Sequence, residues 1–571
     1  MTRCRLPVWR ALAALALLAL VAAGTARASQ IAVVAPASGF GQNLGRHLVR
    51  WLEQSGVPAD LVDERVLAAG KSGNGAMPPG KRLAYLVMPK DAHATAVASF
   101  VARGGKALVF YSDSRKLAAL FGVQMPADAY RKAGDSGRFS KIVFGTGGKA
   151  PAASTAPAGA PAAIVQSSSN IFHADALPGR SRVIATWHDR AGRPTGEAAI
   201  LASNAGWWMT HVLLADGDER AKAQFVASVA GASVPGAWSY ASFVAKRKAT
   251  REAERRYALA QAPRPGEIRA VWDHSGYGLF PGDWPRTFRE LRRYGITDIF
   301  VNVAGAGFAH YPSRILPPAP GGPAAPAAKL GNDTLAPCLK AAAGTGIRVH
   351  AWFICFTATR GSAATLADFA RKGWRLRSRN GQLTEYLDPS KPELCQYLLA
   401  ALEELARRAP VQGVHLDFVR WYEGAKLPAD AARHVGRFVV QARARVKAAR
   451  PAALFTAAVF GSYPSCVKSV GQDWGSWLDA GLIDWAVPMN YCENNATYAT
   501  FLGRQCRTPA HARRIVSGIG VTAMESRLGV RQVIDQVKLA RQAGAAGVAF
   551  FDLDYTLVND ILPYLRLGLF R

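Results

Sequence analysis

Gly413-Val414-His415-Leu416-Asp417-Phe418-Val419-Arg420-Trp421 is a largely apolar stretch with one carboxylate at its centre. Such a run of branched and aromatic side chains is typical of a strand buried on both faces of a parallel sheet. An acid in such a strand is costly to bury unless it is paired or opens into a site. Arg420 or His415 would supply the pair, whereas a strand end facing a ligand would supply the site. The stretch predicts a parallel α/β fold with Asp417 as its first candidate for catalysis.

Seven more strands are predicted on either side of this stretch, with helical patterns between them. The eight strands cover residues 268–274, 298–304, 348–356, 414–420, 454–460, 485–490, 515–521 and 547–552. Eight strands with interposed helices in about 300 residues have the size of a (β/α)8 TIM barrel, which we predict for residues 267–571. In that fold the active site lies at the carboxyl ends of the strands.

The positions at and just past these strand ends carry carboxylates and aromatic rings. Hydrolysis of a glycosidic bond needs one acid and one carboxylate that acts as nucleophile or base, and aromatic faces stack on sugar rings. We therefore expect Asp417 and Glu493 to be the catalytic pair, because strands four and six lie on the same part of the rim. The expected substrate-binding residues are Asp273, Trp352, Arg420, Trp421, Asn490, Tyr491 and Asp552.

Alternatives remain for the second carboxylate. Asp273 and Asp552 are the other candidates, and Glu423 lies far along its loop. Asp484 precedes its strand and is expected on the opposite face of the barrel, where residues serve stability. Trp272 and Trp485 are further candidates for stacking, but Trp485 opens an apolar run and is expected in the core.

Residues 29–240 read as a separate α/β domain. Apolar strands at 30–36, 83–88 and 106–111 alternate with helical patterns at 43–54 and 92–103, which predicts a doubly wound, flavodoxin-like sheet. The arrangement resembles the glutamine-amidotransferase-like domains found beside bacterial carbohydrate enzymes. The chain has no Cys between residues 29 and 267, so no amidotransferase nucleophile is available. A charged helical linker, 241–266, ends in Pro263-Arg264-Pro265 and separates the two domains.

Composition and the first 28 residues indicate where the protein works. The chain has 571 residues, 50% of them hydrophobic, with 70 Lys and Arg against 40 Asp and Glu and a net charge of +30. Basic residues before an apolar run, followed by Ala26-Arg27-Ala28, predict a signal peptide of residues 1–28, and the mature chain keeps a charge of about +26. A periplasmic or secreted protein is therefore expected. It would have no nucleic-acid partner and no membrane span after cleavage, and it would associate electrostatically with an anionic envelope.

Six cysteines follow the signal: Cys338, Cys355, Cys395, Cys466, Cys492 and Cys506. Their wide spacing lacks any zinc-type pattern, so we expect neither a metal site nor a cofactor. One or two disulfides are compatible with export, and the sequence does not set their pairing.

An ordered set of motifs resembles the glycosyl-hydrolase-like family 10. The first two motifs are His350-Ala351-Trp352-Phe353 and Tyr386-Leu387-Asp388-Pro389-Ser390. The other two, written in one-letter code, are GVHLDFVR at residues 413–420 and IDWAVPMNY at residues 483–491. The resemblance covers about residues 267–560 and implies a TIM barrel that hydrolyses bacterial envelope glycans. Family members usually have Asn-Pro where this chain has Asp388-Pro389, and many carry a second acid where it has Phe418.

Two functions are consistent with these observations. The first is an exported glycoside hydrolase that cleaves an envelope or extracellular polysaccharide, such as peptidoglycan glycan strands or exopolysaccharide, by a two-carboxylate mechanism. The second is a non-catalytic glycan-binding pseudoenzyme that recruits partners through its N-terminal domain. The carboxylates at the strand ends favour the first, and Phe418 at the position of a family acid favours the second.

Overall fold

A computed structural model describes residues 29–68, 75–133, 137–145, 156–214, 218–320 and 333–571. The predicted signal peptide lies outside these residues. The chain forms two compact units, which meet in sequence between Lys248 and Ala249, within helix α6 (Tyr240–Leu259). Among the described residues, no helix combines the length and the apolar character needed to cross a bilayer.

The first unit is built on a nine-stranded sheet in the order β2-β1-β3-β4-β13-β12-β11-β7-β8. Its first five members are parallel: β2 (Asp60–Asp63), β1 (Ile31–Ala35), β3 (Leu83–Val87), β4 (Lys106–Phe110) and β13 (Gly206–Met209). Val33 packs in the same core as residues of α2 (Gly39–Gln54) and α5 (Glu219–Ser233), and its neighbour Val34 packs with α3 (Ala94–Ala102) and α4 (Arg115–Leu120). Helices cover both faces, so this half is doubly wound as predicted.

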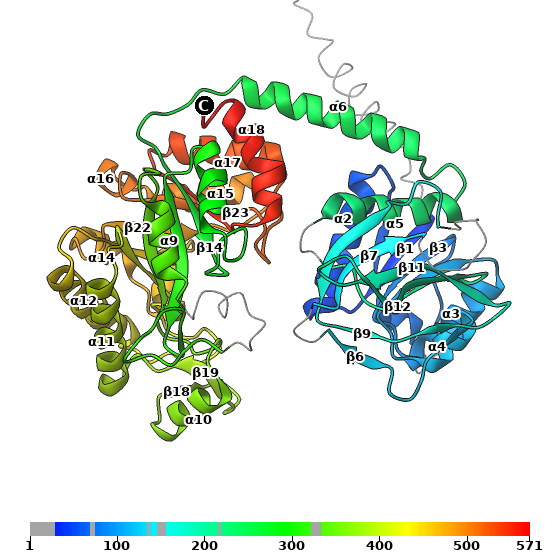
Figure 1. Cartoon of the computed structure of the whole chain (residues 1–571), viewed down its shortest axis with the longest axis horizontal. Helices are drawn as coiled ribbons and strands as arrows, with labels where there is room; N and C mark the ends of the chain where they lie inside the picture. Colours follow the sequence, from blue (N-terminus) through cyan, green and yellow to red (C-terminus); the bar gives the residue numbers. More distant parts are fainter. Residues whose placement is uncertain (1–28, 69–74, 134–136, 146–155, 215–217, 321–332) are drawn as a thin grey trace, which may run out of the picture. The chain divides into compact units, whose positions relative to one another are not determined.

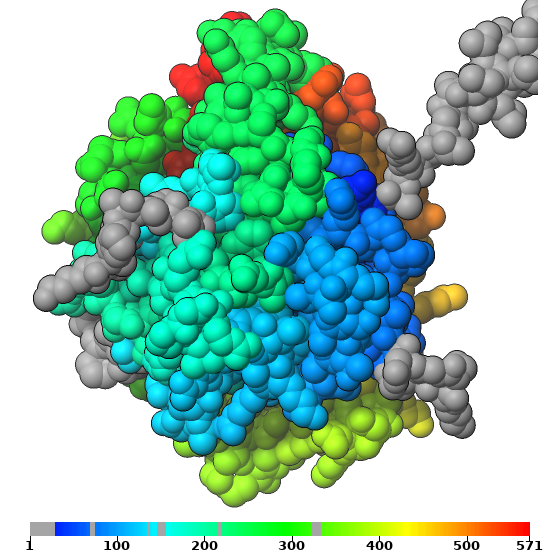
Figure 2. Space-filling model, turned by 90° about the vertical axis from the view of Figure 1, so that its right-hand side faces the viewer, coloured from blue at the N-terminus to red at the C-terminus, as the bar shows by residue number. Residues whose placement is uncertain are grey.

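The other half of the sheet is antiparallel, which the sequence pattern did not reveal. It contains β12 (Pro194–Ser203), β11 (Ser181–His188), β7 (Phe139–Phe144) and β8 (Ala163–Ser168). Only five residues separate β11 from β12 and only two separate β12 from β13, and connections this short permit hairpins but no crossover helix. Figure 2 shows one face of this unit, where blue residues of the parallel half adjoin cyan-to-green residues of the later strands.

Short ribbons complete the first unit. The strands β5 (Val123–Gln124) and β10 (Asp175–Ala176) form one pair, and β6 (Tyr130–Lys132) and β9 (Asn170–Phe172) form another. The structure thus confirms an α/β domain and makes its sheet mixed. The amidotransferase-like resemblance stays a prediction.

The second unit is a TIM barrel in which all eight predicted strands are present. They are β14 (Ile268–Asp273), β15 (Asp298–Gly305), β17 (Arg348–Ile354), β20 (Gly413–Asp417), β21 (Leu454–Phe460), β22 (Trp485–Met489), β23 (Val516–Gly520) and β24 (Gly547–Phe551). Neighbouring strands pair in parallel from β22 round to β23, and a parallel bridge from Ala486 to Ile515 joins the two ends. The sheet is therefore almost closed.

Helices surround these strands (Figure 1). They are α7 (Trp284–Arg293), α9 (Leu335–Ala342), α11 (Pro392–Arg408), α12 (Ala431–Ala449), α13 (Ser465–Val470), α14 (Trp474–Asp479), α15 (Asn495–Gln505), α16 (Pro509–Ala512), α17 (Val530–Gln542) and α18 (Leu562–Leu567). Helix α11 shows why they form: Pro392 occupies its first turn with Glu393, and Arg407 and Arg408 end it, which complements the helix dipole. Its buried leucines face the barrel core.

The barrel has one insertion that the sequence pattern did not suggest. After β17 come α10 (Ala363–Arg371) and a hairpin of β18 (Arg375–Arg377) and β19 (Leu383–Leu387). The strands are short and polar, so they carry no apolar run, although Asn380-Gly381 is a hairpin signal and Gly381 has φ +81°. A short strand, β16 (Phe308–Ala309), also pairs with β15.

Most of the predicted linker is helical and forms part of α6. The second half of α6 belongs to the barrel, because Ala258 packs in the barrel core and the Tyr257 hydroxyl bonds to Asp535.

All six cysteines that follow the predicted signal are free, and four of them are buried. The structure therefore shows none of the disulfides that export would permit among the described cysteines.

Candidate active site

The carboxyl ends of the barrel strands bring the predicted residues to one mouth. Asp417 ends β20, Tyr491 comes two residues after β22, and Asp552 follows β24 through a cis peptide bond. His274 comes directly after β14. These strands are parallel, so the four side chains share the end of the barrel at which TIM-barrel enzymes carry their chemistry.

Asp417 is buried and held by two contacts. Its Oδ1 accepts a hydrogen bond of 2.6 Å from the Phe418 amide and lies 3.6 Å from Nη1 of Arg420. Burial raises the pKa of Asp417, while Arg420, the Phe418 amide, His274 and Trp352 oppose the rise. Phe418 has φ +49°, a left-handed conformation that is strained for an aromatic residue and that is found most often at functional sites.

Arg420 is itself buried, 7% exposed, between two aromatic rings. Its guanidinium carbon lies 4.1 Å from the ring centre of Phe418 and 4.4 Å from that of Phe460. The predicted pairing of Arg420 with Asp417 is therefore present. His415 is not the partner, because its ring nitrogens contact the Trp272 indole and the Thr456 hydroxyl, and burial lowers its pKa well below the ordinary value.

Tyr491 connects Asp417 with the acids of the last two loops. Burial raises the pKa of the Tyr491 hydroxyl, and the charges of Asp417, Glu525 and Asp552 raise it further. Burial also raises the pKa of Asp552, and the charge of Asp273 adds to the rise, although a 3.0 Å hydrogen bond from the Thr522 hydroxyl opposes it. Tyr491 therefore feels the charges of Asp417, Glu525 and Asp552, and of these three only Asp552 directly follows a barrel strand other than that of Asp417.

Asp554 lies two residues beyond Asp552. Burial raises the pKa of Asp554 to about 6, and the charge of Asp552 contributes to the rise. Its carboxylate accepts a 2.7 Å hydrogen bond from the Leu557 amide, which opposes it. Two neighbouring acids with raised pKa values hold a proton to a higher pH than ordinary aspartates do.

Glu493 occupies a different environment. It is exposed, and its carboxylate accepts a hydrogen bond of 3.2 Å from the Arg527 amide in the loop that precedes α17. The amide of Gln532 donates to its backbone carbonyl. These contacts fix the β22–α15 loop against the next loop, and the role of Glu493 as the second catalytic carboxylate stays a prediction.

Two of the predicted binding residues have structural partners. Asp273 is 1% exposed, and its oxygens accept from the Ser275 hydroxyl and from the amides of Gly276 and Gly278. Gly276 has φ +76°, and a Cβ there would lie 2.2 Å from the Asn302 carbonyl oxygen, so glycine is needed for this loop. Asp273 therefore organises the loop after β14.

Asn490 is also engaged inside the barrel. Its Nδ2 donates to Gln505 Oε1 and Ser517 Oγ, both at 3.0 Å, and its Oδ1 accepts from Gln505 Nε2 at 2.7 Å. With no exposed surface, Asn490 holds β22 to the segments beside it. Only the folded packing reveals this, because its partners lie 15 and 27 residues away.

The aromatic residues pack in two clusters. Trp272, Trp352 and Trp485 pack in the barrel interior, as expected for Trp485. Trp421 lies in a small cluster with Leu376 and Ala425. Trp352 also borders the site, because its ring centre lies 5.8 Å from that of His274 and its indole N–H favours the charged form of Asp417.

The sequence interpretation did not select His274, Tyr386 or Tyr422. His274 is exposed to solvent, yet surrounding protein desolvates it enough to lower its pKa, as expected for a side chain in a concave site. Tyr386 and Tyr422 stack with ring centres 3.9 Å apart, next to Phe418. Tyr386 belongs to one of the motifs on which the family resemblance rests, and that motif was the feature of the sequence from which its place at the site could have been predicted.

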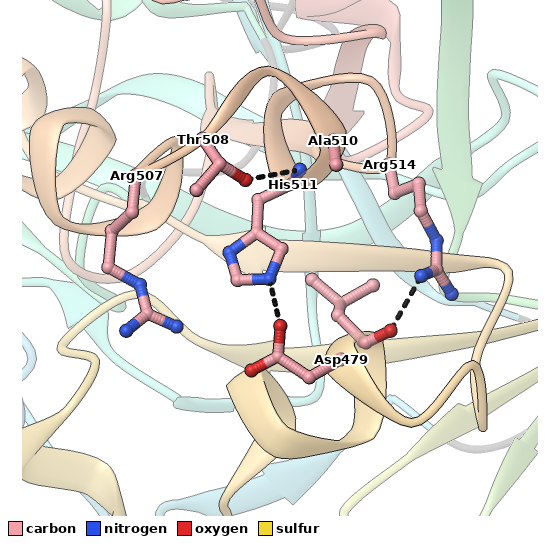
Figure 3. A pocket seen from close by; sticks show the side chains of 7 residues that line it. Asp479, Arg507, Thr508, Ala510, His511 and Arg514 are labelled. Atoms are coloured by element: carbon pink, nitrogen blue, oxygen red, sulfur yellow. Dashed lines mark hydrogen bonds and ion pairs between the residues drawn. The ribbon is translucent and has the colours of Figure 1, made fainter.

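Two surface hollows of about 340 and 380 Å³ lie at the opposite end of the barrel. They are lined by residues at the ends of α14 and α17 and in the segment between α15 and β23. Figure 3 shows the first, where His511 bonds to Asp479 at 2.5 Å and Arg514 donates to the Leu478 carbonyl. These contacts precede β22 and β23, on the face associated with stability, so the hollows are not the catalytic site.

Comparisons with solved structures find similarity to glycoside hydrolases. The chain is 14% identical to the PgaB (BpsB) glycoside hydrolase domain of Bordetella bronchiseptica, covering 52% of this chain and 97% of that one with a TM-score of 0.41. The chain is 13% identical to a class V chitinase of Cycas revoluta, covering 52% of this chain and 98% of that one with a TM-score of 0.35. It is 10% identical to an endo-1,4-beta-mannanase of Rhizomucor miehei, covering 51% of this chain and 89% of that one with a TM-score of 0.37.

A search of curated proteins finds no match. The family resemblance drawn from the motifs is confirmed over part of the barrel, from α7 to the start of α12. Residues 284–431, which include Trp352, Asp417 and Arg420, match the family Glycosyl hydrolase-like 10.

Proposed function

We propose that this protein is an exported glycoside hydrolase that cleaves a bacterial envelope or extracellular polysaccharide with two carboxylates, Asp417 and Asp552. The observation that carries the proposal is the placement of buried Asp417 and partly buried Asp552 at the carboxyl ends of β20 and β24, where the charges of both act on Tyr491. The family match over residues 284–431 supports an enzyme that acts on glycans.

The environments of the two carboxyls suggest their roles. Arg420 and the Phe418 amide stabilise the charged form of Asp417, which suits a nucleophile or a base that activates water. The charge of Asp273 favours the protonated form of Asp552, which suits the acid that protonates the leaving oxygen. As the glycosidic C–O bond breaks, the proton of Asp552 passes to the leaving sugar, and Asp417 or its water bonds to the anomeric carbon. Glu493 is the second candidate for the acid.

Export and envelope association belong to the same proposal. The predicted signal peptide directs the chain to the periplasm or the exterior, and the mature charge of about +26 attracts it to anionic polymers. Lys246, Arg247, Lys248, Arg251, Arg255 and Arg256 of α6 contribute to this charge.

Glycan binding without cleavage is the alternative. It is favoured by Phe418, which stands where many family members carry an acid. In that case the mouth would hold a polymer while the first unit recruits a partner.

Product analysis distinguishes the two functions. The mature chain is incubated with peptide-free peptidoglycan strands and with exopolysaccharide, and new reducing ends are counted beside Asp417→Asn and Glu385→Gln. Glu385 is an exposed acid of β19 and serves as the matched control. We expect cleavage by the parent and by Glu385→Gln only, and binding without new reducing ends in the parent would favour the alternative.

A further inference from the structure

Arg360 lies in the loop between β17 and α10, next to the candidate active site. Its Nη1 donates to the His274 carbonyl at 3.4 Å, and its Nη2 to Nε2 of His310 at 3.2 Å. Its guanidinium carbon lies 4.7 Å from the ring centre of Phe308. Burial lowers the pKa of Arg360, so the surrounding protein desolvates this cation.

No carboxylate within the described part of the chain lies within 4 Å of this guanidinium. Arg420 and Arg348, two other cations of the barrel, each have such a partner: Asp417 at 3.6 Å and Asp298 at 2.9 Å. Asp273 acts on Arg360 from farther away, but its own loop already occupies its oxygens. A desolvated cation without a counter-ion is unfavourable, and an anionic ligand would remove that cost.

His310 and Tyr277 extend the same site. Arginine only donates, so Nε2 of His310 accepts, and its proton lies on Nδ1. Burial lowers the pKa of His310 to about 3, which keeps the ring neutral. Nδ1 then donates to the Tyr277 hydroxyl oxygen at 3.0 Å, and the hydroxyl hydrogen of Tyr277 is left for another acceptor. Arg360 and Tyr277 thus offer a charge and a neutral donor together.

This group adjoins the proposed reaction centre. The charges of Arg360 and Asp417 both act on the pKa of His274, whose ring lies between Trp352 and Phe551 with centres 5.8 Å from each. Asp552 and Asp554 follow β24 at the same end of the barrel, and the charge of Asp273 acts on both Arg360 and Asp552. A ligand bound at this end therefore meets both a cation and acids.

We propose that Arg360 and Tyr277 bind a carboxylate on a sugar ring beside the cleaved bond, so that the substrate is an acidic glycan. The inference rests on the proposed function and specifies its substrate class. A planar guanidinium with donors to spare matches a carboxylate through paired, charge-assisted hydrogen bonds.

Binding tests this without requiring turnover. Full-length Asp417→Asn protein is titrated calorimetrically with peptide-free peptidoglycan strands and with polygalacturonate, each beside its carboxyl-reduced, neutral form. The same titrations are made after adding Arg360→Gln or Arg371→Gln. Arg371 is an exposed cation of α10 paired with Asp368, and it controls for the general loss of one positive charge. Thermal unfolding confirms that each variant is folded.

We expect Arg360→Gln to weaken binding of one of the acidic polymers by about 10- to 100-fold, the range of a hydrogen bond to a charged group, and to leave its neutral form unaffected. Arg371→Gln should change neither. Equal weakening of acidic and neutral forms, or no weakening of either, would overturn the inference. Failure of the proposed function shows separately, as binding by the parent that yields no new reducing ends.

Discussion

The pKa values of aspartates shift in opposite directions at the two ends of the barrel. At the amino ends, Asp298 contacts Arg348 at 2.9 Å and His350 at 2.8 Å, and these contacts outweigh its burial and lower its pKa. At the carboxyl ends, burial outweighs the contacts of Asp417, Asp552 and Asp554, and their pKa values rise. Asp298 and Asp417 are both buried, so burial alone does not mark function. At the amino ends the acids have basic partners and stabilise the fold, whereas Asp417 and Asp552 lie at the carboxyl ends, where TIM barrels carry their chemistry. Asp273 lies at the same end, and its pKa also rises, but its own loop occupies its oxygens.

Two more acids at the amino ends have basic partners. Glu267 contacts Arg541 at 2.6 Å, with Arg269 and Arg264 at 3.5 and 3.6 Å. Asp484 contacts Arg443 and Lys447 and accepts from the Phe455 amide at the start of β21. This confirms the expectation that Asp484 lies on the stability face.

The largest expected effect separates the two candidates for the second carboxylate. Asp552→Asn should lower kcat for glycan cleavage by about 10²- to 10⁴-fold, the usual contribution of a general acid. Glu493→Gln makes the same carboxylate-to-amide change on an exposed loop and should leave kcat within about threefold of the parent. Rates of reducing-end formation measure both. The reverse order would make Glu493 the acid.

A second prediction concerns the partner of Asp417. Arg420→Met keeps the side-chain length between Phe418 and Phe460 but leaves a buried carboxylate unpaired, which costs about 3–5 kcal/mol of unfolding free energy. The same change should raise the pKa of Asp417, because Arg420 opposes the effect of burial. Urea unfolding measures the first effect. Stability equal to that of the parent would show that the pair contributes nothing to the fold.

The smallest effect is the pH dependence of stability. The pKa of Asp554 is raised to about 6 from 3.8, so the folded protein holds this proton more tightly than the unfolded chain. Its contribution to stability is complete below about pH 4 and is lost as the pH rises through 6. As the pH rises from 4.5 to 7, the Tm of Asp554→Asn should therefore fall by less than the Tm of the parent. Circular dichroism melts check this, and identical slopes for the two proteins would contradict it.

The sequence predicted the barrel well because each strand is a run of apolar residues followed by a helical pattern. It also named Arg420, three residues from Asp417, and His415 as the two possible partners of that acid, and the folded structure selects Arg420. It could not predict that Asp273 accepts hydrogen bonds from its own loop, or that Asn490 is hydrogen-bonded to Gln505 and Ser517. Arg360 was missed for the same reason, since the feature that singles it out, a missing counter-ion, exists only in the folded structure.

The central claim is that the carboxyl-end acids serve chemistry and the amino-end acids serve stability. Asp417→Asn and Asp298→Asn make the same change at the two ends of the barrel, and one experiment records both Tm and the rate of glycan cleavage per folded molecule. We predict that Asp417→Asn loses nearly all cleavage per folded molecule, although it also lowers Tm because it leaves the buried Arg420 without its partner. Asp298→Asn also removes the partner of a cation and lowers Tm, but it should retain the rate of cleavage per folded molecule. Full cleavage by Asp417→Asn, or an equal loss of rate per folded molecule in both variants, would contradict the account.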